Sequence, residues 1–388
     1  MPPIWWRGSR RCLPDNPPDI RPVFIGSEIY RGSSYGRWHP LAVPRVPQVI
    51  DLCRALGWLD AVSYRTSPVA KPEALTAWHT PAYIAALQEA ERRQTVSPEI
   101  RARHHLGTTS NPIYPAMFRR PATAAGGVLL AAALLARGGA VHSPGGGTHH
   151  GMPDRANGFC FLNDPVLAIL ALRAAGCARV AYVDIDAHHC DGVEHAFRDD
   201  PSVLVLSVHE QGRWPRTGAV DDRGCGNVIN LPVPPGFHDD EMAALRDAVI
   251  LPRVAVFRPD AVVLQCGADA VLEDPMSRLA LSNNAHVAVL DGLWPLSPRF
   301  LVLGGGGYNP WSVGRLWTRV WGRLAGREAT EILPPAAQAI LADLRWTGLR
   351  AARPVAPHWI SSLADPARGG AIRPEIRRLI AAHSGAMV

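Results

Sequence analysis

Residues that can bind a metal ion follow two apolar segments of this 388-residue chain. Residues 180–186 read VAYVDID and continue as AHHCDG, so Asp184, Asp186 and His188 recur at a spacing of two. Because side chains alternate along a strand, we expect these three on one side as the strand ends. Asp269 follows the second segment, VVLQCGAD. Asp186, His188 and Asp269 would give one zinc ion three ligands and leave a position for water and substrate.

Each of these residues alone also fits a structural role, as a helix cap or a buried hydrogen-bonded group. Three carboxylates and a histidine at adjacent strand ends favour a metal site, because burying them without a cation would be costly. A two-metal site would want further acidic residues two positions after His188 and Asp269. Cys190 and Val271 stand there, so the sequence favours a single ion.

Two glycine-rich turns carry groups that could act beside such an ion. The turn HSPGGGTHHG delivers His149 and His150, and a histidine can take a proton from water and return it to a leaving amine. The turn LVLGGGGYNP delivers Tyr308, whose hydroxyl can stabilise an oxyanion. A second tandem pair, His104 and His105, lacks flanking glycines and a preceding strand, so we expect it on the solvated surface.

Short apolar segments alternate with helical patterns, which predicts an α/β fold with a parallel sheet covered on both faces. Ligands of such sheets bind beyond the carboxyl ends of the strands. The clearest strands are expected at 140–142, 180–186, 203–208, 261–265 and 300–303, and helices at 123–137, 164–175, 239–257 and 310–324. We expect an N-terminal extension at 1–21, a catalytic domain at 22–330 and a C-terminal tail at 331–388 that packs on the same domain.

Composition indicates a globular protein of a reducing compartment. Hydrophobic residues make up 47% and charged residues 19%. The net charge is +6, but the basic residues are scattered, so no direct nucleic-acid binding is expected. Seven cysteines form no C-x-x-C pair. Residues 1–11 lack the apolar core of a signal peptide and the apolar segment 124–136 is too short to span a bilayer, so a cytoplasmic protein without membrane contact is expected.

Together these motifs resemble the histone deacetylase superfamily, and in particular the bacterial acetoin utilization deacetylases. The resemblance runs from about Tyr30 to Trp321, and it includes GFCFLND at 158–164 and HPLAVPR at 39–45. It implies a single-domain arginase/deacetylase-like fold, with an eight-stranded parallel sheet sandwiched by helices. It also implies one Zn²⁺ per chain on Asp186, His188 and Asp269. It further implies a structural K⁺, which would be held by Asp184, Asp186, His188, Ser207 and Val208.

The resemblance further implies roles for single residues. His150 would be the general base and acid, and His149 its electrostatic partner. Asp184 and Asp191 would orient the two histidines, and Tyr308 would stabilise the oxyanion. The remaining positions belong to a narrow tunnel for an aliphatic stem, with Phe159 and Trp214 as its walls and Gly158, Met276 and Gly306 as further substrate-binding positions.

The implied activity is hydrolysis of acyl-lysine amides in proteins, with acetate as a product. Acetylpolyamines or other small amides are an alternative, although Met276 stands where an acidic residue would attract their ammonium group. A non-hydrolysing reader of acyl-lysine is a third possibility. Departures from the family pattern occur at Trp214, at Pro81, where relatives that grip a peptide often carry Asp, and at Cys190. Acyl preference, oligomeric state and the choice between zinc, iron and cobalt stay open.

Overall fold

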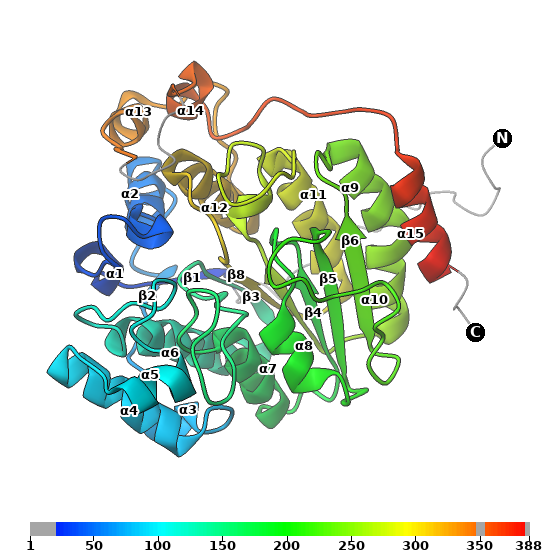
Figure 1. Cartoon of the computed structure of the whole chain (residues 1–388). Coiled ribbons are helices and arrows are strands. Elements are labelled where there is room, and N and C mark those ends of the chain that lie inside the picture. The colour runs from blue at the N-terminus through cyan, green and yellow to red at the C-terminus, as the bar shows by residue number, and fades with distance from the viewer. Residues whose placement is uncertain (1–20, 347–353, 385–388) are drawn as a thin grey trace.

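Eight parallel strands form one sheet through the middle of the molecule (Figure 1). The computed structural model describes residues 21–346 and 354–384, so the predicted N-terminal extension lies almost wholly outside the described residues. The order across the sheet is β2-β1-β3-β8-β7-β4-β5-β6. The strands are β1 (Val23–Gly26), β2 (Tyr64–Thr66), β3 (Gly139–Ser143), β4 (Val180–Asp184), β5 (Val203–Glu210), β6 (Val228–Val233), β7 (Ala261–Gln265) and β8 (Arg299–Leu303).

Helices cover both faces of the sheet, as the apolar strands predict. Side chains of β7 alternate between two cores: Val262 and Leu264 join one, Ala261 and Val263 the other. The first core is closed by α2 (Val46–Ala55), α9 (Asp239–Leu245), a π-helical turn (Arg246–Ile250), α10 (Leu251–Phe257), α11 (Asn283–Leu293), α12 (Pro310–Leu324) and α15 (Pro374–Ser384). The second is closed by α6 (Arg119–Leu134), α7 (Asp164–Ala174) and α8 (Asp191–Phe197).

A third core lies beside the sheet and reaches the loops at its carboxyl edge. It joins α4 (Pro81–Arg93) to Phe161 and Tyr308. Further short helices among the described residues are α1 (Ile29–Gly32), α3 (Pro72–Leu75), α5 (Pro98–His104) and the 3-10 turns Pro40–Ala42, Leu135–Arg137, Ala268–Ala270 and Trp294–Leu296. In the described part of the chain no helix is both long and apolar enough to cross a bilayer.

The C-terminal segment packs against the body of the protein through α13 (Pro335–Ala342), α14 (Pro357–Ser361) and α15. Leu341 and Trp359 share a core with Leu52 of α2 and Trp311 of α12. Ile376 of α15 belongs to the core under the sheet. The segment therefore lies on the same body as the sheet, while the boundaries drawn at residues 21 and 330 stay predictions.

Candidate active site

The predicted site residues follow five strands that are neighbours in the sheet, in the order β3-β8-β7-β4-β5. Each of these strands leads at its carboxyl end into a loop that contributes to one site. The contributions are His149 and His150 after β3, Tyr308 after β8, Asp269 after β7, Asp186 and His188 after β4, and Trp214 after β5. Parallel strands end at one edge of a sheet, so residues far apart in sequence meet there.

Asp186, His188 and Asp269 form a buried group that could hold a metal ion, with one ligand atom of each within 4.8 Å of the others. His188 Nδ1 lies 3.2 Å from Asp186 Oδ1 and 2.9 Å from Asp269 Oδ2. We expected strand alternation to continue to His188, but the strand β4 ends at Asp184. Backbone N–H groups orient the carboxylates instead: that of His188 donates to Asp186 Oδ1 and that of Ala187 to Asp269 Oδ1, both at 3.0 Å.

The surroundings of this group fit a bound cation. Burial and the neighbouring Asp186 carboxylate raise the pKa of Asp269, so two carboxylates share this buried space at a cost that a divalent ion would remove. Glycines leave room around them: a Cβ on Gly267 would lie 2.1 Å from Asp186 Oδ2, and one on Gly306 2.0 Å from Asp269 Oδ2. Two carboxylates and an imidazole, all held in place, are a donor set that suits zinc.

The tandem histidines are each held by a carboxylate. His149 Nδ1 lies 2.7 Å from Asp184 Oδ2, and His150 Nδ1 lies 2.6 Å from Asp191 Oδ1. The two Nε2 atoms are 2.9 Å apart, so one Nε2 carries a hydrogen and donates a hydrogen bond that the other Nε2 accepts. Tyr182 adds a hydrogen bond from its hydroxyl to Asp184 Oδ2 at 2.6 Å. Both rings are thereby fixed with Nε2 toward each other.

The two histidines differ in charge. Burial lowers the pKa of His149, but the carboxylates of Asp184 and Asp186 together raise it by more, so that the pKa lies at about 9. Burial and the neighbouring His149 lower the pKa of His150 to about 4. A neutral His150 that donates its Nδ1 proton to Asp191 keeps a lone pair on Nε2, so this atom can accept a proton.

An outer cavity opens from these groups to solvent, and we call it the mouth. Phe159 and Trp214 both line it, as do Gly158 and Met276. The Trp214 ring meets the His150 ring edge-on with centroids 4.6 Å apart, while 43% of its surface stays exposed. A Cβ on Gly158 would lie 2.2 Å from that indole, so only glycine fits there. The mouth also includes His188, Tyr308, Glu210, Arg213, Arg216 and Arg278.

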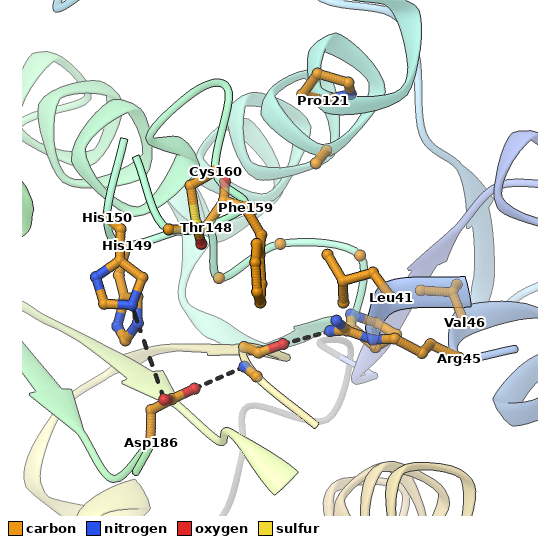
Figure 2. Close-up of a pocket in the computed structure, with 18 of the residues that line it drawn as sticks. Leu41, Arg45, Val46, Pro121, Thr148, His149, His150, Phe159, Cys160 and Asp186 are labelled. Atoms are coloured by element: carbon orange, nitrogen blue, oxygen red, sulfur yellow. Dashed lines mark hydrogen bonds and ion pairs between the residues drawn. The ribbon is translucent and has the colours of Figure 1, made fainter. Parts of the chain in front are cut away.

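A second, inner cavity is lined by Asp186, His149 and His150, among others (Figure 2). Leu41, Arg45 and Val46 line it from the N-terminal loop and α2, and Phe159 separates them from the histidines in the picture. The Arg45 guanidinium donates to the carbonyl oxygen of Gly305 and lies 4.9 Å from the centre of the Trp317 ring. In the sequence, Arg45 stands out only as the last residue of the segment 39–45 that resembles the family, and its place in this cavity was not predicted.

Asp274 is a second residue that sequence reasoning missed. Its carboxylate is buried and accepts backbone hydrogen bonds from Tyr308 at 2.6 Å and Met276 at 2.8 Å. Burial and the nearby Asp269 raise its pKa to about 8. Asp274 thus ties the loop after β7 to the loop that carries Tyr308. Its only signal in the sequence is an acidic residue five positions after Asp269.

One expectation about the surroundings of the site is wrong. His104 is buried at 2% exposure, and its Nδ1 lies 2.5 Å from the carbonyl oxygen of Asp154. It is the last residue of α5, whereas His105 is exposed and lines the mouth. Pro81, one of the departures from the family pattern, is the first residue of α4. Cys190 is fully buried and packs against the apolar core beneath α8.

Comparison with known proteins places the chain. A model of the histone deacetylase domain matches residues 39–324. The chain belongs to the histone deacetylase family. The acetoin utilization protein AcuC of Bacillus subtilis is 34% identical over 327 residues, which cover 81% of this chain and 84% of the relative. Histone deacetylase 8 of Xenopus tropicalis is 35% identical over 300 residues, covering 75% and 80% of the two chains.

Solved structures of this family share the fold. The crystal structure of a histone deacetylase homologue from Aquifex aeolicus matches with a TM-score of 0.89 and 34% identity, over 94% of this chain and 100% of that chain. A homologue complexed with SAHA gives the same TM-score, identity and coverage. The predicted family and the predicted eight-stranded deacetylase fold are therefore confirmed, and the chain is a member of a hydrolase family whose relatives are deacetylases.

Proposed function

We propose that this deacetylase-family protein hydrolyses Nε-acetyl-lysine, or a related acyl-lysine, in proteins and releases acetate. The observation that carries the proposal is that one member of each of three groups lines the same mouth: His188 of the possible metal-binding triad, His150 of the paired histidines, and Tyr308. The mouth between Phe159 and Trp214 suits an extended aliphatic stem such as that of lysine.

The roles of the chain's own residues follow from their surroundings. His150 would take a proton at Nε2 from the attacking water and later deliver it to the leaving amine, with Asp191 holding its other nitrogen. His149, kept charged between Asp184 and Asp186, would stabilise negative charge beside it. The Tyr308 hydroxyl would donate to the acyl oxygen as negative charge builds there. Tyr308 as a residue is only 7% exposed, so water competes little for this hydrogen bond.

Asp186, His188 and Asp269 would hold the metal ion. A bound Zn²⁺ would polarise the acyl carbonyl and lower the pKa of a water molecule toward neutrality. We also propose a structural K⁺ near Asp184, Asp186, His188, Ser207 and Val208; Asp184 and Ser207 are register partners on β4 and β5. The described cysteines are free thiols, which fits the proposed location in the reducing cytoplasm.

A direct assay tests the proposal: acetate release from acetyl-lysine peptides by the zinc-loaded protein, compared with acetylspermidine. We expect hydrolysis of the peptides, its loss with a chelator and its return with zinc. Tyr308→Phe should lower kcat by about a hundredfold, the scale of one lost oxyanion donor. Peptide binding without acetate release would support a reader instead, and faster turnover of acetylspermidine would favour the polyamine alternative.

A further inference from the structure

Arginines surround the mouth. Arg213 and Arg216 flank Trp214 on the loop after β5, and Arg278 lies on the loop after β7; all three line the mouth. Arg216 and Arg278 are exposed. Within the described residues, neither guanidinium has a hydrogen-bond or ion-pair partner. A guanidinium carries its charge throughout the physiological pH range, so both offer free donors to whatever enters.

Glu210 is the one carboxylate among the described residues that line the mouth, and its charge is already balanced. It is 5% exposed. Arg213 Nη2 donates to its Oε1 at 3.0 Å, and the backbone N–H of Arg278 donates to its Oε2 at 2.8 Å. Arg213 and Glu210 therefore neutralise each other. Arg216 and Arg278 remain as two uncompensated positive charges at the entrance, and a cleft focuses their field on an approaching substrate.

We propose that the mouth selects acyl-lysine substrates that carry carboxylates, Asp or Glu, next to the acylated lysine. The inference rests on the proposed function. When the lysine stem lies between Phe159 and Trp214, the residues beside it in the substrate stay outside, where Arg216 and Arg278 stand. A guanidinium pairs with a carboxylate through two parallel hydrogen bonds. The same charges repel the free ammonium group of an acetylated polyamine, which disfavours that substrate.

The test uses three peptides that differ only in the residues on each side of one acetyl-lysine: Asp, Asn or Lys. We measure kcat/KM with the zinc-loaded protein at low ionic strength and in 0.5 M NaCl. We expect the Asp peptide to exceed the Asn peptide by about threefold to tenfold, the scale of one or two exposed ion pairs. The Lys peptide should fall below both, and high salt should compress the series because it screens exposed charges.

Charge reversal makes the test specific. Arg216→Glu and Arg278→Glu should each lower the Asp-to-Lys ratio of kcat/KM by about tenfold, and the double variant should prefer the Lys peptide. Arg137→Glu is the matched control. Arg137 is exposed and precedes β3, at the opposite edge of the sheet from the mouth. The Arg137→Glu variant changes the net charge as much as either single mouth variant does, and we expect it to keep the wild-type order of the three peptides in kcat/KM.

Each result has one reading. Equal kcat/KM for the three peptides at low salt, within about twofold, overturns the inference, and so does a shift in Arg137→Glu as large as that in the mouth variants. The Asn peptide separates this failure from a failure of the proposed function. If it is hydrolysed without any charge ranking, the inference alone is wrong; if no peptide releases acetate, both are wrong.

Discussion

A single methyl group at Gly306 should disable the proposed metal site. The Gly306 N–H donates to Asp186 Oδ2 at 2.6 Å, so the backbone of the glycine-rich loop touches the carboxylates directly. A Cβ at this position would lie 2.0 Å from Asp269 Oδ2, 2.5 Å from Asp269 Cγ and 2.9 Å from Asp186 Oδ2. Unlike Gly305 and Gly307, Gly306 does not have a positive φ. Gly306→Ala therefore acts by steric contact alone.

The size of the effect follows from these distances. Contacts of Cβ below 3.0 Å essentially never occur, so the Asp269 carboxylate would have to move by at least about 1 Å. Metal sites tolerate deviations of only about 0.2 Å in ligand distance. Disturbing residues that merely orient ligands already costs tenfold to a hundredfold in affinity. Displacing a ligand should cost more, so we expect zinc to bind Gly306→Ala at least about a hundredfold more weakly.

The assay is zinc content after dialysis against buffered zinc, with thermal unfolding measured with and without the metal. Zinc should raise the Tm of the wild type, because it binds the folded state, and should leave that of Gly306→Ala unchanged. Gly32→Ala is the control, since a Cβ there meets nothing within 4 Å. A Gly306→Ala protein that keeps one tightly bound zinc and deacetylates within threefold of wild type would refute this assignment of the metal ligands.

Two further substitutions probe the loops. Asn163→Ala removes a cap of α7 and two amide hydrogen bonds, to the carbonyl oxygens of His149 at 3.2 Å and Gly151 at 2.9 Å. Urea unfolding should show about 2–4 kcal/mol less stability, the cost of a lost cap plus stranded buried carbonyls; a loss below 1 kcal/mol would contradict it. Asp274→Ala should lower kcat at least tenfold with zinc content and KM nearly unchanged, because Tyr308 loses its backbone anchor; an unchanged kcat would exclude that positioning role.

The central strands could be predicted because they are continuous apolar segments. The interval 261–265 coincides with β7, and the helix at 310–324 with α12. The outer strands could not. β2 has three residues, none of them buried, so no apolar pattern marks it. β6 contains Pro232, which reads as a strand breaker, yet β6 forms an edge of the sheet, where proline is tolerated.

The site was predictable where its residues lie directly after strands. Asp186 and His188 follow β4 within four residues, and strand ends converge at one edge of the sheet. The contact between Trp214 and His150 joins two loops 64 positions apart, and no periodicity encodes it; here only the resemblance pointed to Trp214. Arg45 and Asp274 were missed because their partners are backbone groups of distant loops, which leave no side-chain pattern to match.

Residues at the N-terminal ends of two helices, α7 and α12, also hold the loops of the site, so the stability of these helices is linked to the geometry of the site. Asn309 begins α12 by accepting from the N–H groups of Trp311 and Ser312, directly after Tyr308. Asp164, in the first turn of α7, accepts from the N–H groups of Gly147 at 2.7 Å and Thr148 at 2.9 Å, just before the tandem histidines. Since each helix can start only where its cap is satisfied, forming α7 and α12 sets the path of both glycine-rich loops. The glycines supply close approach, and the helix starts remove the freedom that glycines would otherwise leave.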